Sequence, residues 1–163
     1  MAAELAMLLT LVDQGFNRTS WHGPNLRGSI RGVSAKEASF RPAPRRHNIW
    51  EQALHAAYWK YVVWRRLTGE KRGSFGVSGS NWIERPLKRM SEREWKQDIA
   101  LLEKMHRTLR QAIAALPPKS LHKPIRGSRS RKITPARLIT GIAMHDVYHA
   151  GQIGLIKRLL RGS

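Results

Sequence analysis

The chain has 163 residues, a length that suits one domain over residues 1–163 with a buried core, and its 41% hydrophobic content and six tryptophans exclude a disordered chain. It contains no cysteine, which excludes disulfides, thiolate metal ligands and a catalytic thiol of its own. Lys and Arg number 30 against 11 Asp and Glu, and the net charge of +19 predicts nonspecific, salt-sensitive binding to polyanions without indicating a dedicated nucleic-acid function.

The first predicted element is a helix over about residues 3–17, because apolar residues recur at helical spacing (Leu5, Leu8, Leu9 and Val12). The N-terminal stretch MAAELAMLLT has an acidic residue, no basic leader and no small-residue cleavage pattern, so it predicts a helix and not a signal peptide. No apolar run approaches the roughly 18 residues of a membrane span. We therefore expect a cytoplasmic protein with no membrane partner.

A connection containing glycine and proline follows, and we expect only a short helical turn in it, near residues 35–38. The second long helix is predicted to begin after Asn48, which forms a capping-box pattern with Glu51 three residues later. Gly69 is its expected end. The next connection, residues 70–90, contains three glycines and a proline, which predicts a long irregular loop.

The third helix is predicted to begin at Ser91, which forms a second capping-box pattern with Glu94, and to stop before the Pro-Pro pair. A basic linker leads to Thr134 and Pro135, a cap followed by proline at the first helical position, and this pair indicates a fourth helix to about Leu160. No strand pattern and no internal repeat is evident. The expected fold class is all-α, a four-helix bundle with long connections.

Two histidines interrupt the apolar stretch MHDVYHAGQI of the fourth helix. Positions i and i+4 are neighbours on a helix surface, so the imidazoles of His145 and His149 can converge on one ion. His55 interrupts an apolar face of the second helix, and packing of the two faces would bring three imidazoles together. Three histidines with an open position are the arrangement of catalytic zinc. The alternative for each is an inert, hydrogen-bonded core histidine.

The residues around this pair allow several roles. A zinc protease requires a glutamate directly after the first histidine as general base, and Asp146 stands there instead, so we exclude that class. Asp146 is a candidate hydrogen-bond partner for a ligating histidine, with a salt bridge as the equal alternative. Tyr148 flanks the ligands, and Gln152, one turn after His149, is a candidate to point into the same pocket.

Two segments carry a resemblance to a known family: HNIWEQALHAAYWKYVVWRRLTG and HDVYHAGQIGLIKRL. Together with weaker support from WHGPNLRG and from Asn81-Trp82, they resemble the DinB-like superfamily, especially its YfiT-like branch of metal-binding four-helix bundles. By position, the resemblance implies a metal site made of His55, His145 and His149. It implies a divalent metal ion as cofactor, commonly nickel or zinc, and a homodimer.

Characterised members of that family include low-molecular-weight-thiol S-transferases and a mycothiol-dependent isomerase. The leading hypothesis is therefore a metal-dependent enzyme of thiol S-transferase or hydrolase type, acting on a small-molecule substrate such as a low-molecular-weight thiol. A strongly basic nucleic-acid-binding module is an alternative from another class, although no helix-turn-helix, zinc-finger or RNA-binding signature supports it. A catalytically silent metal-binding bundle shares every sequence feature of the leading hypothesis.

We expect the pocket over the site to open between Trp21-His22 and Asn81-Trp82. Arg45 and Arg46 are candidates to attract an acidic substrate there. His22 and His47 are each expected at the surface or in a capping role. A position at the pocket mouth is the alternative for both.

The other polar and aromatic side chains are predicted to lie outside the site. His106 is expected at an exposed helix position, and His122 has no assigned role. The tryptophans of the second helix are expected in packing or dimer contacts (Trp50, Trp59 and Trp64).

Overall fold

The computed structural model describes residues 2–86, 90–125, 130 and 132–162. Its four long helices are α1 (Ala2–Phe16), α4 (Ile49–Thr68), α5 (Glu92–Ala114) and α6 (Pro135–Arg161). Shorter elements are α2 (Leu26–Ile30), α3 (Ala35–Ser39) and the 3₁₀ turn η2 (Pro118–Ser120). The described residues contain no strand, so the predicted all-α four-helix bundle is confirmed. Part of the loop at 87–89 and part of the basic linker at 126–129 and 131 lie outside the described residues.

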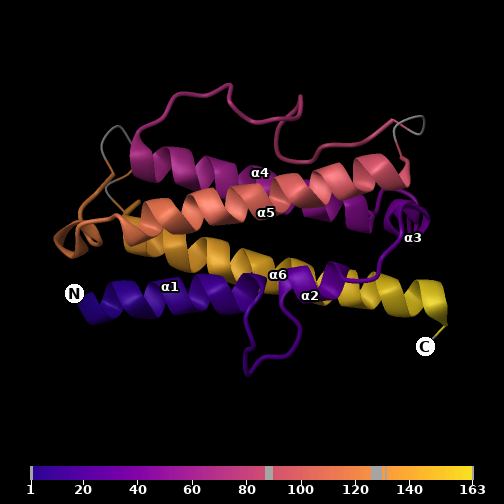
Figure 1. Ribbon diagram of the computed structural model, residues 1–163, viewed down its shortest axis with the longest axis horizontal. Coiled ribbons are helices and arrows are strands. Elements are labelled where there is room, and N and C mark those ends of the chain that lie inside the picture. The colour runs from indigo at the N-terminus through magenta and orange to yellow at the C-terminus, as the bar shows by residue number, and fades with distance from the viewer. Residues whose placement is uncertain (1, 87–89, 126–129, 131, 163) are drawn as a thin grey trace.

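The long helices form two parallel pairs, with α1 and α6 running in one direction and α4 and α5 in the other (Figure 1). The parallel course of α4 and α5 agrees with their contacts, since Trp50 near the start of α4 donates to Asp98 near the start of α5 at 2.7 Å. The connection between these helices must run back along the bundle, and Figure 1 shows it passing over α4. This return brings Asn81 of the loop against His55 of α4.

The helix signals at α4 and α5 are satisfied locally. Asn48 accepts the backbone N–H of Glu51 at 2.8 Å, and the Glu51 carboxylate accepts the backbone N–H of Asn48 at 3.2 Å. Gly69 ends α4 with a left-handed φ of 80°, which favours glycine. At α5, Ser91 accepts from the backbone N–H of Glu94 and donates its hydroxyl to the Glu94 carboxylate. Both predicted starts are confirmed.

The predicted start of α6 is also confirmed, with the Thr134 side chain accepting a backbone N–H of the first turn and Pro135 in that turn. The first connection holds more helix than predicted. Helix α2, capped by Asn25, was missed because five residues are too few to show helical periodicity. Helix α3, capped by Ser34, extends the expected turn at 35–38 by one residue.

The core joins the helices through buried apolar side chains and one close backbone approach. At Gly15 of α1, an added Cβ would lie 2.8 Å from the carbonyl oxygen of Ala143 on α6, so glycine permits the contact between these helices. Lys60 of α4 and Asp146 of α6 are both fully buried and form an ion pair. Of the two roles expected for Asp146, the structure has the salt bridge.

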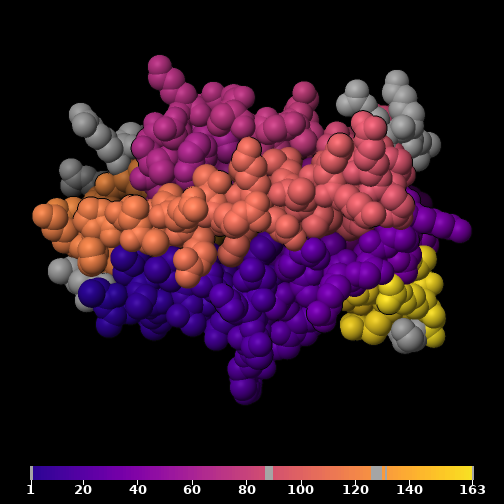
Figure 2. Space-filling model, in the orientation of Figure 1, coloured from indigo at the N-terminus to yellow at the C-terminus, as the bar shows by residue number. Residues whose placement is uncertain are grey.

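The first connection, between α1 and α2, lies away from the side of α6 that packs against α4. Figure 2 shows the segment between α1 and α2 projecting from the body of the protein, and Trp21 within it is fully exposed. The helices of the described part of the chain include none with the length and apolar character to cross a bilayer.

Candidate metal centre

The three histidines predicted as ligands meet between α4 and α6. The Nε2 atom of His145 lies 3.1 Å from Nε2 of His55 and 3.2 Å from Nε2 of His149. One nitrogen from each ring lies within 4.8 Å of the other two. Nitrogens about 2.0–2.1 Å from a tetrahedral ion are roughly 3.3 Å apart, so the observed spacings suit ligands of a single ion.

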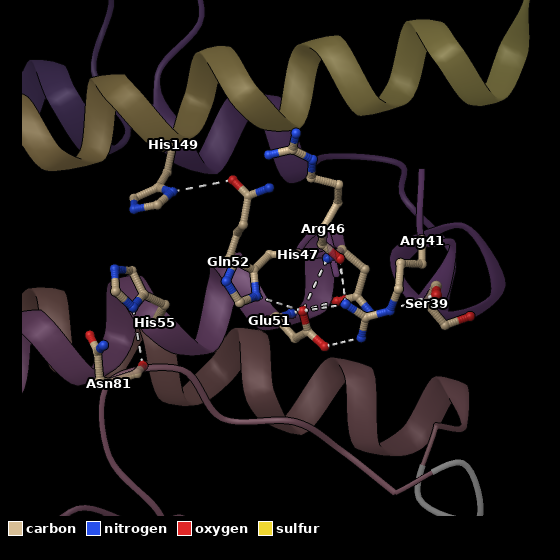
Figure 3. A network of polar contacts seen from close by, with 10 residues as sticks. Ser39, Arg41, Arg46, His47, Glu51, Gln52, His55, Asn81 and His149 are labelled. Carbon is tan, nitrogen blue, oxygen red and sulfur yellow. Dashed lines mark hydrogen bonds and ion pairs between the residues drawn. The ribbon is translucent and has the colours of Figure 1, made fainter. Parts of the chain in front are cut away.

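Two hydrogen bonds determine which ring nitrogens are free. The Nδ1 atom of His55 lies 3.1 Å from the carbonyl oxygen of Asn81, and Nδ1 of His149 lies 3.2 Å from Oε1 of Gln52 (Figure 3). Both partners are carbonyl oxygens, which only accept, so each Nδ1 carries the proton. The Nε2 atoms of His55 and His149 then have lone pairs, and both face His145.

His145 cannot satisfy this arrangement alone. Its buried Nδ1 atom has no hydrogen-bond partner among the residues that the structure describes. A proton on Nε2 can serve only one of the two facing lone pairs and leaves Nδ1 as an unpaired acceptor, whereas a proton on Nδ1 leaves three Nε2 lone pairs facing each other. A cation among the three Nε2 atoms removes the repulsion between the lone pairs. The donor set therefore fits a divalent ion that accepts imidazole ligands.

Burial keeps the three rings in the neutral form that binds metals. Together with the charges of the neighbouring histidines, it lowers the pKa of His145 to about 3. Burial and the charge of His55 lower the pKa of His149 to about 4. The pKa of His55 is also lowered, chiefly by burial. At neutral pH, His55 and His149 therefore each offer an unprotonated Nε2 to an ion.

The returning loop holds the His55 side of the centre. Trp82 stacks between two imidazoles, with ring centroids 3.5 Å from His47 and 3.8 Å from His55 and interplanar angles of 4° and 10°. Asn81 has a left-handed φ of 57°, which asparagine tolerates better than most residues. Its side-chain Oδ1 accepts from Trp59 Nε1 at 2.9 Å while its backbone oxygen accepts from His55. The loop thus sets both the tautomer and the plane of His55.

A buried carboxylate fixes the segment that leads into α4. Glu51 receives hydrogen bonds from the Arg41 guanidinium, from Nδ1 of His47 at 3.0 Å and from the backbone of Asn48 (Figure 3). Arg41 also donates to the backbone oxygen of Arg46. The connection from α3 to α4 is therefore tied to the first turn of α4, whereas the sequence indicated only the capping role of Glu51.

A pocket of about 610 Å³ borders the centre. It shares Gln52 and Trp82 with the histidine contacts. Its other walls come from the α3–α4 connection and from α6 (Pro42, Ala43, Arg45, Arg46, His47, Tyr148, Gln152, Leu155, Ile156 and Leu159). Gln152 lines this pocket, as predicted, and donates to the Tyr148 hydroxyl at 2.9 Å.

The expected pocket opening is right on one side and wrong on the other. Arg45, Arg46 and Trp82 do line the pocket. Trp21 does not, and His22 lines a different groove formed by α1 and α6. The reason is that the first connection follows the end of α1, and α1 and α4 pack on different sides of α6.

The expected exposure of His106 is wrong. Its ring is only 3% exposed and stacks on Phe16 of α1, with centroids 3.8 Å apart. Burial, followed by the charge of Lys60, lowers the pKa of His106 to about 3. The partner ring comes from a helix 90 residues away along the chain, which helical periodicity within α5 cannot reveal. His122 lies at the surface and contacts Glu4 at 2.7 Å.

Two residues that hold the ligands were not assigned that role by sequence reasoning. Gln52 lies three positions before His55, a spacing that puts both on one helix face, and this was the available signal. Asn81 acts through its backbone oxygen, for which a sequence has no signal.

Trp50 is buried, and Trp59 and Trp64 pack against the core, which agrees with the expected packing role.

The comparisons with known proteins address the family directly. Residues 18–153 match the sequence model of the DinB superfamily. Comparisons with curated proteins and with solved structures gave no significant match. The matched range covers most of the chain and includes His55, His145 and His149. The chain therefore belongs to the DinB superfamily.

Proposed function

We propose that this protein is a metal-dependent enzyme of thiol S-transferase or hydrolase type, acting in the cytoplasm on a small molecule. His55, His145 and His149 would hold one divalent ion, with nickel or zinc as the proposed metal. The observation that carries the proposal is the pair of protonated Nδ1 atoms that leaves Nε2 of His55 and His149 directed at His145. A merely structural histidine cluster would not need two lone pairs aimed at one imidazole nitrogen, which carries at most one proton.

When bound, a divalent ion supplies Lewis acidity that lowers the pKa of a thiol or water reaching it. The ligand set proposed here consists of neutral imidazoles, which leave the positive charge of the ion undiminished. Among the described residues, the cluster of potential ligands has three members and includes no carboxylate. This arrangement favours an anionic or ionisable substrate group over a neutral one.

The protein residues around the centre bind and orient. Gln52 and Asn81 hold the ligating rings in one tautomer, and Trp82 covers one face of His55. The 610 Å³ pocket is of the size that small-molecule sites have. A substrate in it would lie against Gln52 and Trp82, next to the ligating rings.

The first experiment is elemental analysis of purified protein and of two single variants. We expect one divalent ion per chain in the wild type, most of it lost in His149→Ala and all of it kept in His122→Ala, whose imidazole is exposed. Stoichiometric metal in His149→Ala would contradict the assignment. Activity with thiol and ester substrates should disappear on chelation and return with nickel or zinc. No activity with any divalent ion would favour the catalytically silent bundle.

We also propose a homodimer formed through α1 and α6. Neither α1 nor residues 138–156 of α6 contain a Lys or Arg, although the chain has 30 of them. Met7, Leu11 and Met144 are 57%, 39% and 67% exposed, and the last two line one groove. Two chains of charge +19 repel each other least where they present an apolar face without Lys or Arg, so this face suits a second copy.

A further inference from the structure

We infer that the 610 Å³ pocket binds an amphipathic carboxylate, with the acid group at Arg45 and Arg46 and the apolar chain along the end of α6. The inference rests on the proposed function only for the statement that the ligand is a substrate. Binding itself depends on the pocket and is testable without metal.

The charged part of the pocket is one-sided. Arg45 and Arg46 line it, and none of the twelve described side chains around it is acidic. Within the described residues, neither guanidinium has a hydrogen-bond or ion-pair partner, although six ion pairs between Lys or Arg and a carboxylate form elsewhere. Unpaired guanidinium groups of two consecutive residues that line one concave surface are suited to bind a carboxylate.

The segment that carries these arginines is held in place before any ligand arrives. Arg41 connects the Arg46 carbonyl oxygen to the buried Glu51, and Arg45 adopts a left-handed φ of 62° that is uncommon for a residue with a side chain. Figure 3 shows the Arg46 guanidinium on the α6 side of this network, away from the Glu51 carboxylate. Such preorganisation lowers the entropic cost of binding an anion.

The wall opposite is apolar and incompletely covered. Leu155 and Leu159 of α6 are 51% and 60% exposed, and both line the pocket together with Ile156. A small hydrophilic anion would leave these side chains in water, whereas an alkyl or aryl chain would bury them. The combination of two guanidinium groups and leucines one turn apart therefore selects an amphipathic ligand over a purely polar one.

The pocket reaches the metal centre through one side chain. Gln52 presents Oε1 to Nδ1 of His149 and also lines the pocket, and its amide nitrogen lies on the side away from His149 (Figure 3). That nitrogen is a further donor for an oxygen atom of the ligand. A ligand held by Arg45 and Arg46 would thus be separated from the proposed ligating ring of His149 by the Gln52 side chain.

The test is isothermal titration calorimetry on metal-free protein at physiological salt, with octanoate, acetate and 1-octanol as probes. Octanoate should bind once per chain, and acetate and 1-octanol at least about tenfold more weakly, because each lacks one of the two recognised features. Arg45→Gln/Arg46→Gln and Leu155→Asn/Leu159→Asn should each weaken octanoate binding by at least about tenfold. Arg93→Gln/Arg107→Gln on α5, which removes the same two charges elsewhere on the surface, should leave it unchanged.

Equal loss of octanoate affinity in the two arginine variants would mean general charge attraction and would overturn the inference, as would acetate binding as tightly as octanoate or no octanoate binding. His145→Ala separates this inference from the proposed function, because His145 does not line the pocket. It should lose metal and keep octanoate binding. A wild-type protein that binds octanoate without binding metal would refute only the proposed function, and metal binding without octanoate binding would refute only the inference.

Discussion

The Nδ1–H of His149 donates to Oε1 of Gln52 at 3.2 Å, and this contact between α6 and α4 directs Nε2 of His149 toward the other two imidazoles. Gln52 is 3% exposed, so no bulk water can replace its oxygen readily. The Gln52 side chain contacts a proposed ligand without belonging to the proposed ligand set itself. Its contribution should therefore appear in affinity and not in stoichiometry.

Gln52→Ala should weaken divalent-ion binding by about 10–100-fold, because His149 loses the acceptor that fixes its tautomer. Gln52→Glu retains an acceptor oxygen and should retain most of the affinity. Competition with a chromophoric chelator measures both, and Gln111→Ala on exposed α5 surface is the matched control. An unchanged affinity in Gln52→Ala would remove Gln52 from the centre.

Lys60→Met should destabilise the metal-free protein by about 3–5 kcal/mol, because it leaves Asp146 charged and buried without a partner. Burial already raises the pKa of Asp146, and the ion pair with Lys60 opposes that rise. The double variant Lys60→Met/Asp146→Leu removes both charges and should recover most of the loss. Urea unfolding measures the three free energies, and a double variant no more stable than Lys60→Met would argue against an isolated pair.

The stability of metal-free protein should fall as pH decreases below 6.5. The pKa of folded His106 is about 3 against 6.5 for a free histidine, so the unfolded chain takes up the proton first. Between pH 7 and 5 this histidine accounts for about 2 kcal/mol, and the stabilisation continues to decline toward pH 3. The difference in unfolding free energy between pH 7 and pH 5 should be smaller by that amount in His106→Leu than in the wild type. It should equal the wild-type difference in His22→Leu, because His22 is exposed.

Light scattering coupled to size-exclusion chromatography should give twice the mass of one chain for the wild type. Met144→Glu places a carboxylate on the proposed α1–α6 contact and should shift the protein to monomer, since an unpaired charge is costly to bury. Gln111→Glu adds the same charge on α5 and should remain dimeric. Dimers of both variants would locate the contact elsewhere, and a monomeric wild type would refute the dimer.

The charge of +19 should produce binding to DNA and RNA that depends on salt and not on sequence. Affinity for random duplexes should drop about 10³-fold or more between 50 and 200 mM salt if six or more phosphates are contacted. Fluorescence anisotropy with several unrelated duplexes tests this. One sequence bound roughly 1000-fold more tightly than the others at physiological salt would favour the nucleic-acid-binding module instead.

The sequence by itself determined the features that depend on neighbours along the chain. The cap at Asn48, the end of α4 at Gly69 and the start of α6 at Thr134 are each made by residues within four positions of one another. The same holds for the spacing of His145 and His149 on one helix. Each of these was predictable because hydrogen bonding and side-chain direction in a helix repeat over a single turn.

Only the tertiary structure decided how those elements form the candidate metal centre. The acceptor for His55 is a backbone oxygen 26 positions away, and the acceptor for His149 is Gln52, 97 positions away. His106 was misplaced for the same reason, because its burial depends on Phe16 of another helix. Periodicity shows which face of a helix turns inward, but the partner of each inward side chain depends on packing between helices distant in sequence.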